Sequence, residues 1–334
     1  MTRIFSSVWG VVALILACAV FLPLVGSPYV VNLATIIAIY GMLAFGLGVL
    51  VCMTGQLSMG HGALFGLGAY ATAYLVAEAG MGFWPAIFCA AAITAVAGAF
   101  IGAVSLRFEG IFFAIVTFAF SALISSALVN MRSITGGANG LMANFAPPSI
   151  GGWADFNRPD HFFVAVAVAL AVCATLIGAL TRTRFGRACI SIREDQVLAR
   201  CLGVNAFRHK LAAFVISSAI AGFAGGWYAS YLKYIAPDLF TVHLSIEMIM
   251  ILIIGGVFNP VVGPLVGVVI FVLLPESLRF AAAYRAMAFG LLAIAIIITM
   301  PDGIAGTVSK LLRRWRGRED QAAPKAPAIE GQSK

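Results

Sequence analysis

Ten runs of mostly apolar residues, each 15 to 25 residues long, constrain the fold of this 334-residue chain more than any other feature. A helix needs about 20 residues to cross the hydrocarbon core of a membrane, and backbone groups in lipid must pair within their own segment. The runs do not alternate as the strands of a membrane barrel would. They cover residues 7–25, 29–53, 62–77, 84–106, 111–130, 162–180, 211–232, 244–258, 260–275 and 284–300.

These runs predict an all-α integral membrane protein, a polytopic helical bundle of about 8–11 transmembrane helices. The runs at 62–77, 244–258 and 260–275 are short, so half-spans or re-entrant segments are alternatives to full spans there. The first run resembles a signal peptide in its single early cation, Arg3. Its length and its direct continuation into a second run favour an uncleaved first helix.

Composition leads to the same class of protein. Hydrophobic residues make up 62% and charged residues 10% of the chain, against roughly 45–50% and about 25% in soluble domains. A water-soluble core cannot bury so much apolar surface, so membrane lipid is the expected surrounding. Residues 1–310 are expected to form the transmembrane domain, and residues 311–334 a basic, disordered cytoplasmic tail.

The net charge of +8 lies mostly on one side of the expected bundle. If the N-terminus is cytoplasmic and the ten runs alternate in direction, 16 of the 21 Lys and Arg residues fall on the inner side. Seven of these lie in loop 181–210 and seven in the tail from residue 310 onward. The positive-inside rule then places both termini in the cytoplasm and loop 131–161 outside. Topology and anionic lipid explain the basic excess without a nucleic-acid partner.

Two apolar stretches, one in each half of the chain, are interrupted by Gly or Pro at residues 54–62 and 255–264. Interruptions in both halves point to the binding path of a transporter. Non-helical backbone at membrane depth survives only inside protein or beside a water-filled cavity. Ordinary tight turns at the inner surface are the alternative interpretation. Elsewhere, Gly-xxx-Gly spacings such as Gly222 with Gly226 predict closely packed helices.

The chain lacks the residues that hold ATP. A Walker loop needs a lysine directly after a glycine, and none of the five lysines follows a glycine. There is no His-Glu-x-x-His zinc pair, and Ser58 has the wrong glycine spacing for a hydrolase elbow. We therefore expect no catalytic residue, no metal site and no cofactor in this chain.

Loop 181–210 contains a short amphipathic segment, expected to be helical over residues 194–202. Glu194 and Asp195 at its start complement the helix dipole, and Gly203 suits the position after its last turn. Val197 and Leu198 begin i, i+4 pairs on one face. A helix this short is not stable alone in water and needs a surface to dock on. A partner-docking helix and a solvated basic loop both fit the pattern.

Glu247 is the clearest ionisable residue within an expected span, and such residues default to functional roles. Its place near the start of the run 244–258 also allows contact with interfacial water. Gln56, Ser58, His61 and Thr117 are further candidates for a polar path, with hydrogen bonding to neighbouring backbone as the alternative. So few buried ionisable groups give a proton-coupled mechanism little support.

Taken in order over about residues 30–310, several short motifs resemble the permease subunits of branched-chain amino acid ABC importers, the LivM/LivH group and LivM in particular. The motifs are GQLSMGH at 55–61, GLGAY at 66–70, GIFFAIVT at 110–117, TGGANG at 135–140, GR at 186–187, IRED at 192–195, LGV at 202–204, SIE at 245–247, GG at 255–256 and GP at 263–264. Each motif alone is weak, but the ordered set is specific. The chain departs from the group at Gly62, where many relatives carry Ala, and at Phe258-Asn259, which replaces a smaller turn.

The resemblance implies a mechanism driven by partners in a bacterial inner membrane. Permeases of this group act with a second homologous permease, two ATPase subunits that bind ATP and Mg, and a periplasmic solute-binding protein. It also implies that the inner loop docks the ATPase, with Arg187, Arg193, Glu194, Asp195, Arg200 and Gly203 as the coupling residues. The outer loop is then a gate or a binding-protein contact, through Thr135, Gly136, Gly137, Asn139 and Gly140.

The expected function is therefore that of a transmembrane permease subunit of an ABC importer. The solute remains open, because related permeases are similar to importers of urea, short amides and aromatic acids. A stand-alone secondary transporter or channel is the main alternative, and it would need ion-binding carboxylates within the membrane, where only Glu247 is available. A membrane enzyme or a structural scaffold is a third alternative. Activity of the purified chain without partners would support an enzyme or a carrier.

Overall fold

The computed structural model describes residues 2–142 and 156–277, and beyond these residues 290–291, 294–295, 298–300 and 303–307. Most of the expected run 284–300, the whole of the tail 311–334 and the middle of loop 131–161 lie outside the described residues.

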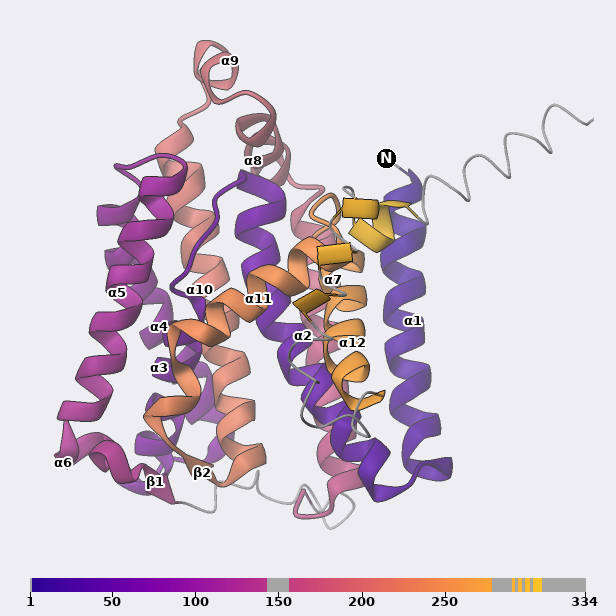
Figure 1. The fold of residues 1–334 in the computed structure, drawn as a ribbon, viewed down its shortest axis with the longest axis vertical. Coiled ribbons are helices and arrows are strands. Elements are labelled where there is room, and N and C mark those ends of the chain that lie inside the picture. The colour runs from indigo at the N-terminus through magenta and orange to yellow at the C-terminus, as the bar shows by residue number, and fades with distance from the viewer. Residues whose placement is uncertain are drawn as a thin grey trace, which may run out of the picture.

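Helices follow one another along most of the described chain (Figure 1). The long ones are α1 (Thr2–Val25), α2 (Pro28–Thr54), α3 (His61–Ala77), α4 (Phe83–Ser105), α5 (Ile111–Asn130), α7 (Pro159–Leu180), α8 (Arg184–Glu194), α10 (Ala206–Leu232), α11 (Val242–Gly255) and α12 (Val262–Ser277). The short elements are α6 (Arg132–Thr135), η1 (Gly137–Asn139), β1 (Leu141–Met142), α9 (Gln196–Cys201), β2 (Tyr234–Ile235) and η2 (Pro237–Phe240).

Five helices in the described part of the chain are long and apolar enough to cross a membrane, namely α2, α4, α5, α7 and α10. Helices α3, α11 and α12 are apolar but have only 17, 14 and 16 residues. At 1.5 Å per residue they are roughly 21–26 Å long, which is less than the ~30 Å of a hydrocarbon core. The expectation of an all-α membrane bundle that includes short segments is confirmed.

Helix α10 is the centre of the bundle and packs against α2, α3 and α4. Glycines allow these contacts. A Cβ atom on Gly68 would lie 2.4 Å from the Cα atom of Gly222, and a Cβ atom on Gly225 would lie 2.1 Å from the carbonyl oxygen of Phe65. No side chain fits at such distances, so α3 and α10 meet backbone to backbone, as small-residue spacings in lipid predict.

Helices α11 and α12 form a tight hairpin around the second interrupted stretch, and α12 also packs against α2. A Cβ atom on Gly255 would lie 1.9 Å from the carbonyl oxygen of Gly263, and a Cβ atom on Gly267 would lie 2.0 Å from that of Ile251. Residues 255–264 are therefore the turn of a hairpin between two short helices.

The bundle has two distinct ends (Figure 1). The start of α1 lies at the same end as α8 and α9, which we call the loop end, while α6, β1 and β2 lie at the opposite end, which we call the ribbon end. Strand β1 pairs antiparallel with β2 and so joins the segment after α5 to the segment after α10. The two polar loops predicted on opposite sides of the membrane thus leave the bundle at opposite ends.

The close approach of α3 and α10 gives a test of the packing. In Gly225→Ala the added methyl group meets the backbone of Phe65 and Ala69, and overpacking of this kind costs about 1–3 kcal/mol. We expect a lower midpoint of thermal unfolding for the detergent-solubilised chain. Gly10→Ala is the matched control, because nothing lies within 4 Å of its Cβ position. Equal midpoints for the two variants would contradict the close approach.

Candidate functional site

Helix α8 begins the inner loop and packs against α2 and α10. Thr183 caps its first turn, with its hydroxyl oxygen accepting a hydrogen bond from the Gly186 N–H at 3.1 Å. Gly186 is needed there, since a Cβ atom would lie 2.2 Å from the carbonyl oxygen of Leu180. Cys189 and Ile192 are buried against the bundle. Helix α8 is thus fixed along the loop end.

Helix α9 follows at once and differs from the expected helix in its first residue. Its first residue is Gln196, and Asp195 is its N-cap, because the carboxylate accepts hydrogen bonds from the N–H groups of Val197 and Leu198 at 2.9 Å each. Glu194 is instead the last residue of α8. The expected helix over 194–202 is therefore wrong at its start. An Asp residue is more favourable as an N-cap, where its carboxylate accepts backbone hydrogen bonds, than inside a helix.

The end of α9 is as predicted. Gly203 has φ +84°, its N–H donates to the Arg200 carbonyl, and the N–H of Val204 donates to the Ala199 carbonyl, each at 3.0 Å. This is a Schellman ending, for which glycine is the usual residue. Nothing lies within 4 Å of the Gly203 Cβ position, so the backbone conformation alone selects glycine here.

Helix α9 protrudes from the loop end (Figure 1), and apolar side chains on it and directly after it are exposed. Val197, Leu198 and Leu202 are 71%, 58% and 76% exposed. Only Ala199 of this helix is buried, in a small apolar cluster with Ile192 and Ala206. Three large aliphatic side chains on one protruding turn form an apolar surface of the kind that partner proteins cover.

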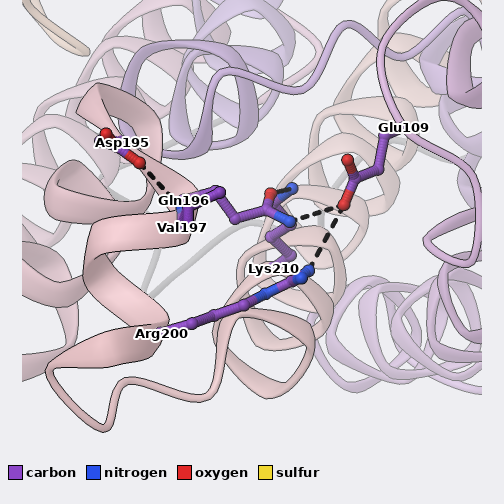
Figure 2. A network of polar contacts seen from close by, with 6 residues as sticks. All are labelled: Glu109, Asp195, Gln196, Val197, Arg200 and Lys210. Atoms are coloured by element: carbon purple, nitrogen blue, oxygen red, sulfur yellow. Dashed lines mark hydrogen bonds and ion pairs between the residues drawn. The ribbon is translucent and has the colours of Figure 1, made fainter.

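A polar network ties α9 to the connection between α4 and α5 (Figure 2). The Gln196 amide donates to the Glu109 carboxylate at 2.6 Å, and Arg200 pairs with the same oxygen at 3.4 Å. The Lys210 ammonium donates to the Gln196 side-chain oxygen. Exposed ion pairs contribute little alone, but together these contacts hold α9 to two other elements. Sequence reasoning identified Arg200 but missed Glu109, Gln196 and Lys210.

Arg193 links α8 to the interior of the bundle. Its guanidinium donates to the carbonyl of Cys52 at 2.7 Å and to that of Val257 at 3.1 Å. Cys52 lies in the last turn of α2, where carbonyls lack an intrahelical partner, and Val257 follows the end of α11. The Cβ position of Gly55, which ends α2 at φ +72°, is 3.4 Å from the Arg193 side chain. One side chain therefore joins the inner loop to both interrupted stretches.

Two of the three residues that depart from the resembled group, Phe258 and Asn259, lie at this contact. The Arg193 guanidinium carbon lies 5.4 Å from the centre of the Phe258 ring, a cation–π distance. Asn259 caps α12, because its side-chain oxygen accepts from the N–H groups of Val261 and Val262 at 2.9 and 3.1 Å. Both residues thus stabilise the turn that Arg193 holds.

The remaining coupling candidates face outward. Arg187 donates to the carbonyl of Arg182 at 2.5 Å within its own loop. Glu194, at the end of α8, is exposed, as is Asp195 in its capping position. Both acidic residues are thus exposed at the junction of α8 and α9.

Three of the path candidates, Ser58, His61 and Thr117, come together in a buried cluster. His61 contacts the hydroxyl of Ser58 at 3.1 Å through Nδ1 and that of Ser217 through Nε2. Ser217 in turn donates to the Gly46 carbonyl, so Nε2 must be the donor to Ser217 and Nδ1 the acceptor. Thr117 accepts from the Met59 N–H at 3.1 Å. A neutral His61 satisfies every partner, so the cluster joins α3, α5 and α10 as a packed unit.

Gln56 and Glu247 lie apart from this cluster. Gln56, in the segment between α2 and α3, is 9% exposed. Glu247 is half-buried on α11, and elsewhere in the bundle the rings of Tyr40 on α2 and Tyr228 on α10 lie 6.0 Å apart. Sequence reasoning singled out neither tyrosine, because a tyrosine within an apolar run is an unremarked core residue until its neighbours are known.

The outer-loop candidates build the ribbon end. Buried Thr135 donates to the carbonyls of Leu128 and Met131 at 2.6 and 2.8 Å and accepts from the Gly137 N–H. Gly136, Gly137 and Gly140 all have positive φ, which only glycine adopts readily. Asn139 is exposed, and its carbonyl accepts from the Tyr234 hydroxyl at 3.2 Å. These residues form a series of tight turns that follows α5 and contacts β2.

Comparison with known proteins agrees with this architecture. A family model described as "Branched-chain amino acid transport system / permease component" matches residues 29–301. The chain is 33% identical over 312 residues to the high-affinity branched-chain amino acid transport system permease protein LivM of Salmonella typhimurium, covering 87% of this chain and 73% of that protein. LivM of Escherichia coli K12 shows the same identity and coverage.

A further relative is the permease protein LivH of Escherichia coli K12, which is 25% identical over 299 residues, 82% of this chain and 94% of that protein. No solved structure matches the chain. The extent of the family match and the identity to the LivM proteins are sufficient for assignment. The chain belongs to the family of permease components of branched-chain amino acid transport systems.

Proposed function

We propose that this chain is the permease subunit of an ABC importer that moves branched-chain amino acids, or a related small polar solute, across a bacterial inner membrane. Separate subunits supply the energy: two ATPases on the cytoplasmic side, which bind ATP and Mg, with a second permease and a periplasmic solute-binding protein completing the complex. The relatives named LivM and LivH, both similar to this chain, support a paired permease.

The proposed orientation places the loop end in the cytoplasm. Residues 181–210, which include α8, α9 and the first turn of α10, carry seven cations, and cytoplasmic loops are enriched in such residues. The start of α1 lies at the same end. The ribbon end, with Asn139 exposed, then faces the solute-binding protein.

The observation that carries the proposal is the double contact of Arg193. ATPase closure would push on α9 through its apolar surface and the carboxylates of Glu194 and Asp195. Since Arg193 at the end of α8 holds carbonyls of both α2 and the α11–α12 turn, movement of the loop reaches both interrupted stretches together. The bundle would then alternate between forms open to either side, with ATP and the loaded binding protein favouring different forms.

Arg193→Ala tests this route in the complete complex reconstituted in vesicles. We expect ATP hydrolysis to persist while solute uptake falls roughly tenfold or more, because two hydrogen bonds from a charged donor are lost, each contributing about 1.5–3 kcal/mol. Arg193→Lys should recover part of the uptake, because both hydrogen bonds leave one guanidinium nitrogen, Nη1, and an ammonium group also carries more than one donor.

Arg184→Ala is the matched control, because it removes the same charge from an exposed position on the same helix. Vesicles that hold the Arg184→Ala complex should take up solute at the wild-type rate. Wild-type uptake by Arg193→Ala would show that the loop does not act through this side chain.

Gly203 offers a second test, on the shape of α9. Gly203→Val forces a β-branched residue to φ +84° and should distort the docking surface, lowering uptake and the amount of ATPase that co-purifies. Gly203→Asn should retain most of both, because asparagine tolerates the left-handed conformation. Since the site is open to solvent, the two variants separate backbone conformation from steric clash. Identical behaviour of the two would argue against a shaped docking helix.

A further inference from the structure

An apolar groove of about 660 Å³ lies between α4 and α7, with α10 at its base. Apart from Phe156, its lining residues come from 84–91 of α4, 161–176 of α7 and 219–227 of α10, and all except His161 are apolar or aromatic. Val172 and Leu176 on its α7 side are 49% and 64% exposed. The apolar groove is therefore open toward the lipid around the bundle.

A polar pocket of about 170 Å³ adjoins the apolar groove, and Phe156 lines both. Its other lining residues lie at the beginning of α2, around the beginning of α7 and at the end of α10, and they include Asn32, Asn157, Tyr231 and Lys233. Lys233 directly precedes β2, so the polar pocket lies at the ribbon end (Figure 1). The surface thus changes from polar at the ribbon end to apolar along the helices, as a membrane leaflet changes from headgroups to acyl chains.

Lys233 gives the polar pocket a positive charge. Its side chain is exposed, and the ion pairs of the described residues, Arg158 with Asp160 and Arg200 with Glu109, do not include it. Its φ of 57° is the only positive φ of a non-glycine residue in the part of the chain that the structure describes. Glycine is the usual residue at such a helix end, so the backbone conformation does not explain a lysine. A cation of this kind at a membrane surface attracts anionic lipid.

The apolar groove also has the length of one leaflet. Its α7 side spans residues 161–176, which is about 22 Å at 1.5 Å per residue. Half of a ~30 Å hydrocarbon core is about 15 Å. The Trp84 ring lies 5.8 Å from the Trp227 ring and 6.3 Å from the Phe156 ring, next to the polar pocket. Aromatic residues gather in this way at the interface between headgroups and acyl chains.

We propose that the polar pocket and the apolar groove together bind one anionic phospholipid of the leaflet at the ribbon end. The phosphate group lies beside the Lys233 ammonium and the Asn32 amide, and one acyl chain lies between α4 and α7. Acyl chains fill an apolar groove that is open to lipid, and the charge of Lys233 selects the headgroup. The inference depends on the membrane location of the bundle and is independent of the importer function.

The test uses lipids with brominated acyl chains, which quench tryptophan fluorescence on contact, because Trp84 and Trp227 both line the apolar groove. The full chain, with Trp9, Trp153 and Trp315 replaced by Phe, is placed in vesicles of phosphatidylethanolamine with a minor share of phosphatidylglycerol. Bromine is carried by the phosphatidylglycerol in one preparation and by an equal share of the phosphatidylethanolamine in the other. We expect competition curves to give about fivefold stronger binding of phosphatidylglycerol, the factor that one lysine at a membrane surface provides.

Substitutions of Lys233 separate its charge from its backbone conformation. Lys233→Asn removes the charge, and asparagine tolerates the left-handed conformation, so the two lipids should then quench equally. Lys233→Arg should keep the preference for phosphatidylglycerol. Arg132→Gln is the matched control, because it removes an exposed cation from α6, elsewhere at the ribbon end, and it should keep the preference too.

Equal quenching by the two lipids with Lys233 in place would overturn the proposal, as would an undiminished preference in Lys233→Asn. Absence of quenching by either lipid would also overturn it, because another part of the chain would then cover the apolar groove. If a second permease made without tryptophan removes the quenching, the apolar groove is an interface between permeases and the proposal fails.

Discussion

Carbonyl groups left open where helices end inside a protein need a donor, and in this protein a single guanidinium supplies it for two helices. The last turn of α2 and the turn after α11 each present a carbonyl to Arg193. Unpaired, each would carry the desolvation cost of a buried polar group. The same contact that completes these helix ends attaches them to α8. Stability and mechanical connection therefore depend on one side chain.

The rest of the bundle gives that contact a firm support. Backbone contacts between α3 and α10, and between α11 and α12, leave no space for side chains to shift, and packed interfaces of this kind move as units rather than deform. The buried cluster around His61 adds hydrogen bonds among α3, α5 and α10. Displacement of α8 is then passed on as movement of whole helices.

Much of the fold could be predicted from the sequence, because apolar length determines helices in lipid and glycine spacing determines where they approach. Gly203 and the Asp195 region were recognisable for the same local reasons, although the capping preference of Asp195 moved the helix start. The partners of Arg193 were not predictable, since Cys52 and Val257 lie 141 and 64 residues away. The neighbours of Glu109, Tyr40 and Tyr228 likewise follow from tertiary packing, which a local sequence pattern does not reveal.

Distance measurement between spin labels tests the central claim most directly. With labels at Leu202, directly after α9, and at Ile253 on α11, both exposed, the complex would be measured without nucleotide and with ATP bound. If Arg193 makes the inner loop and the end of α11 one body, the distance stays the same in both states, and it varies between them once Arg193 is replaced by Ala. A wild-type distance that changes by several ångströms when ATP binds would contradict the account.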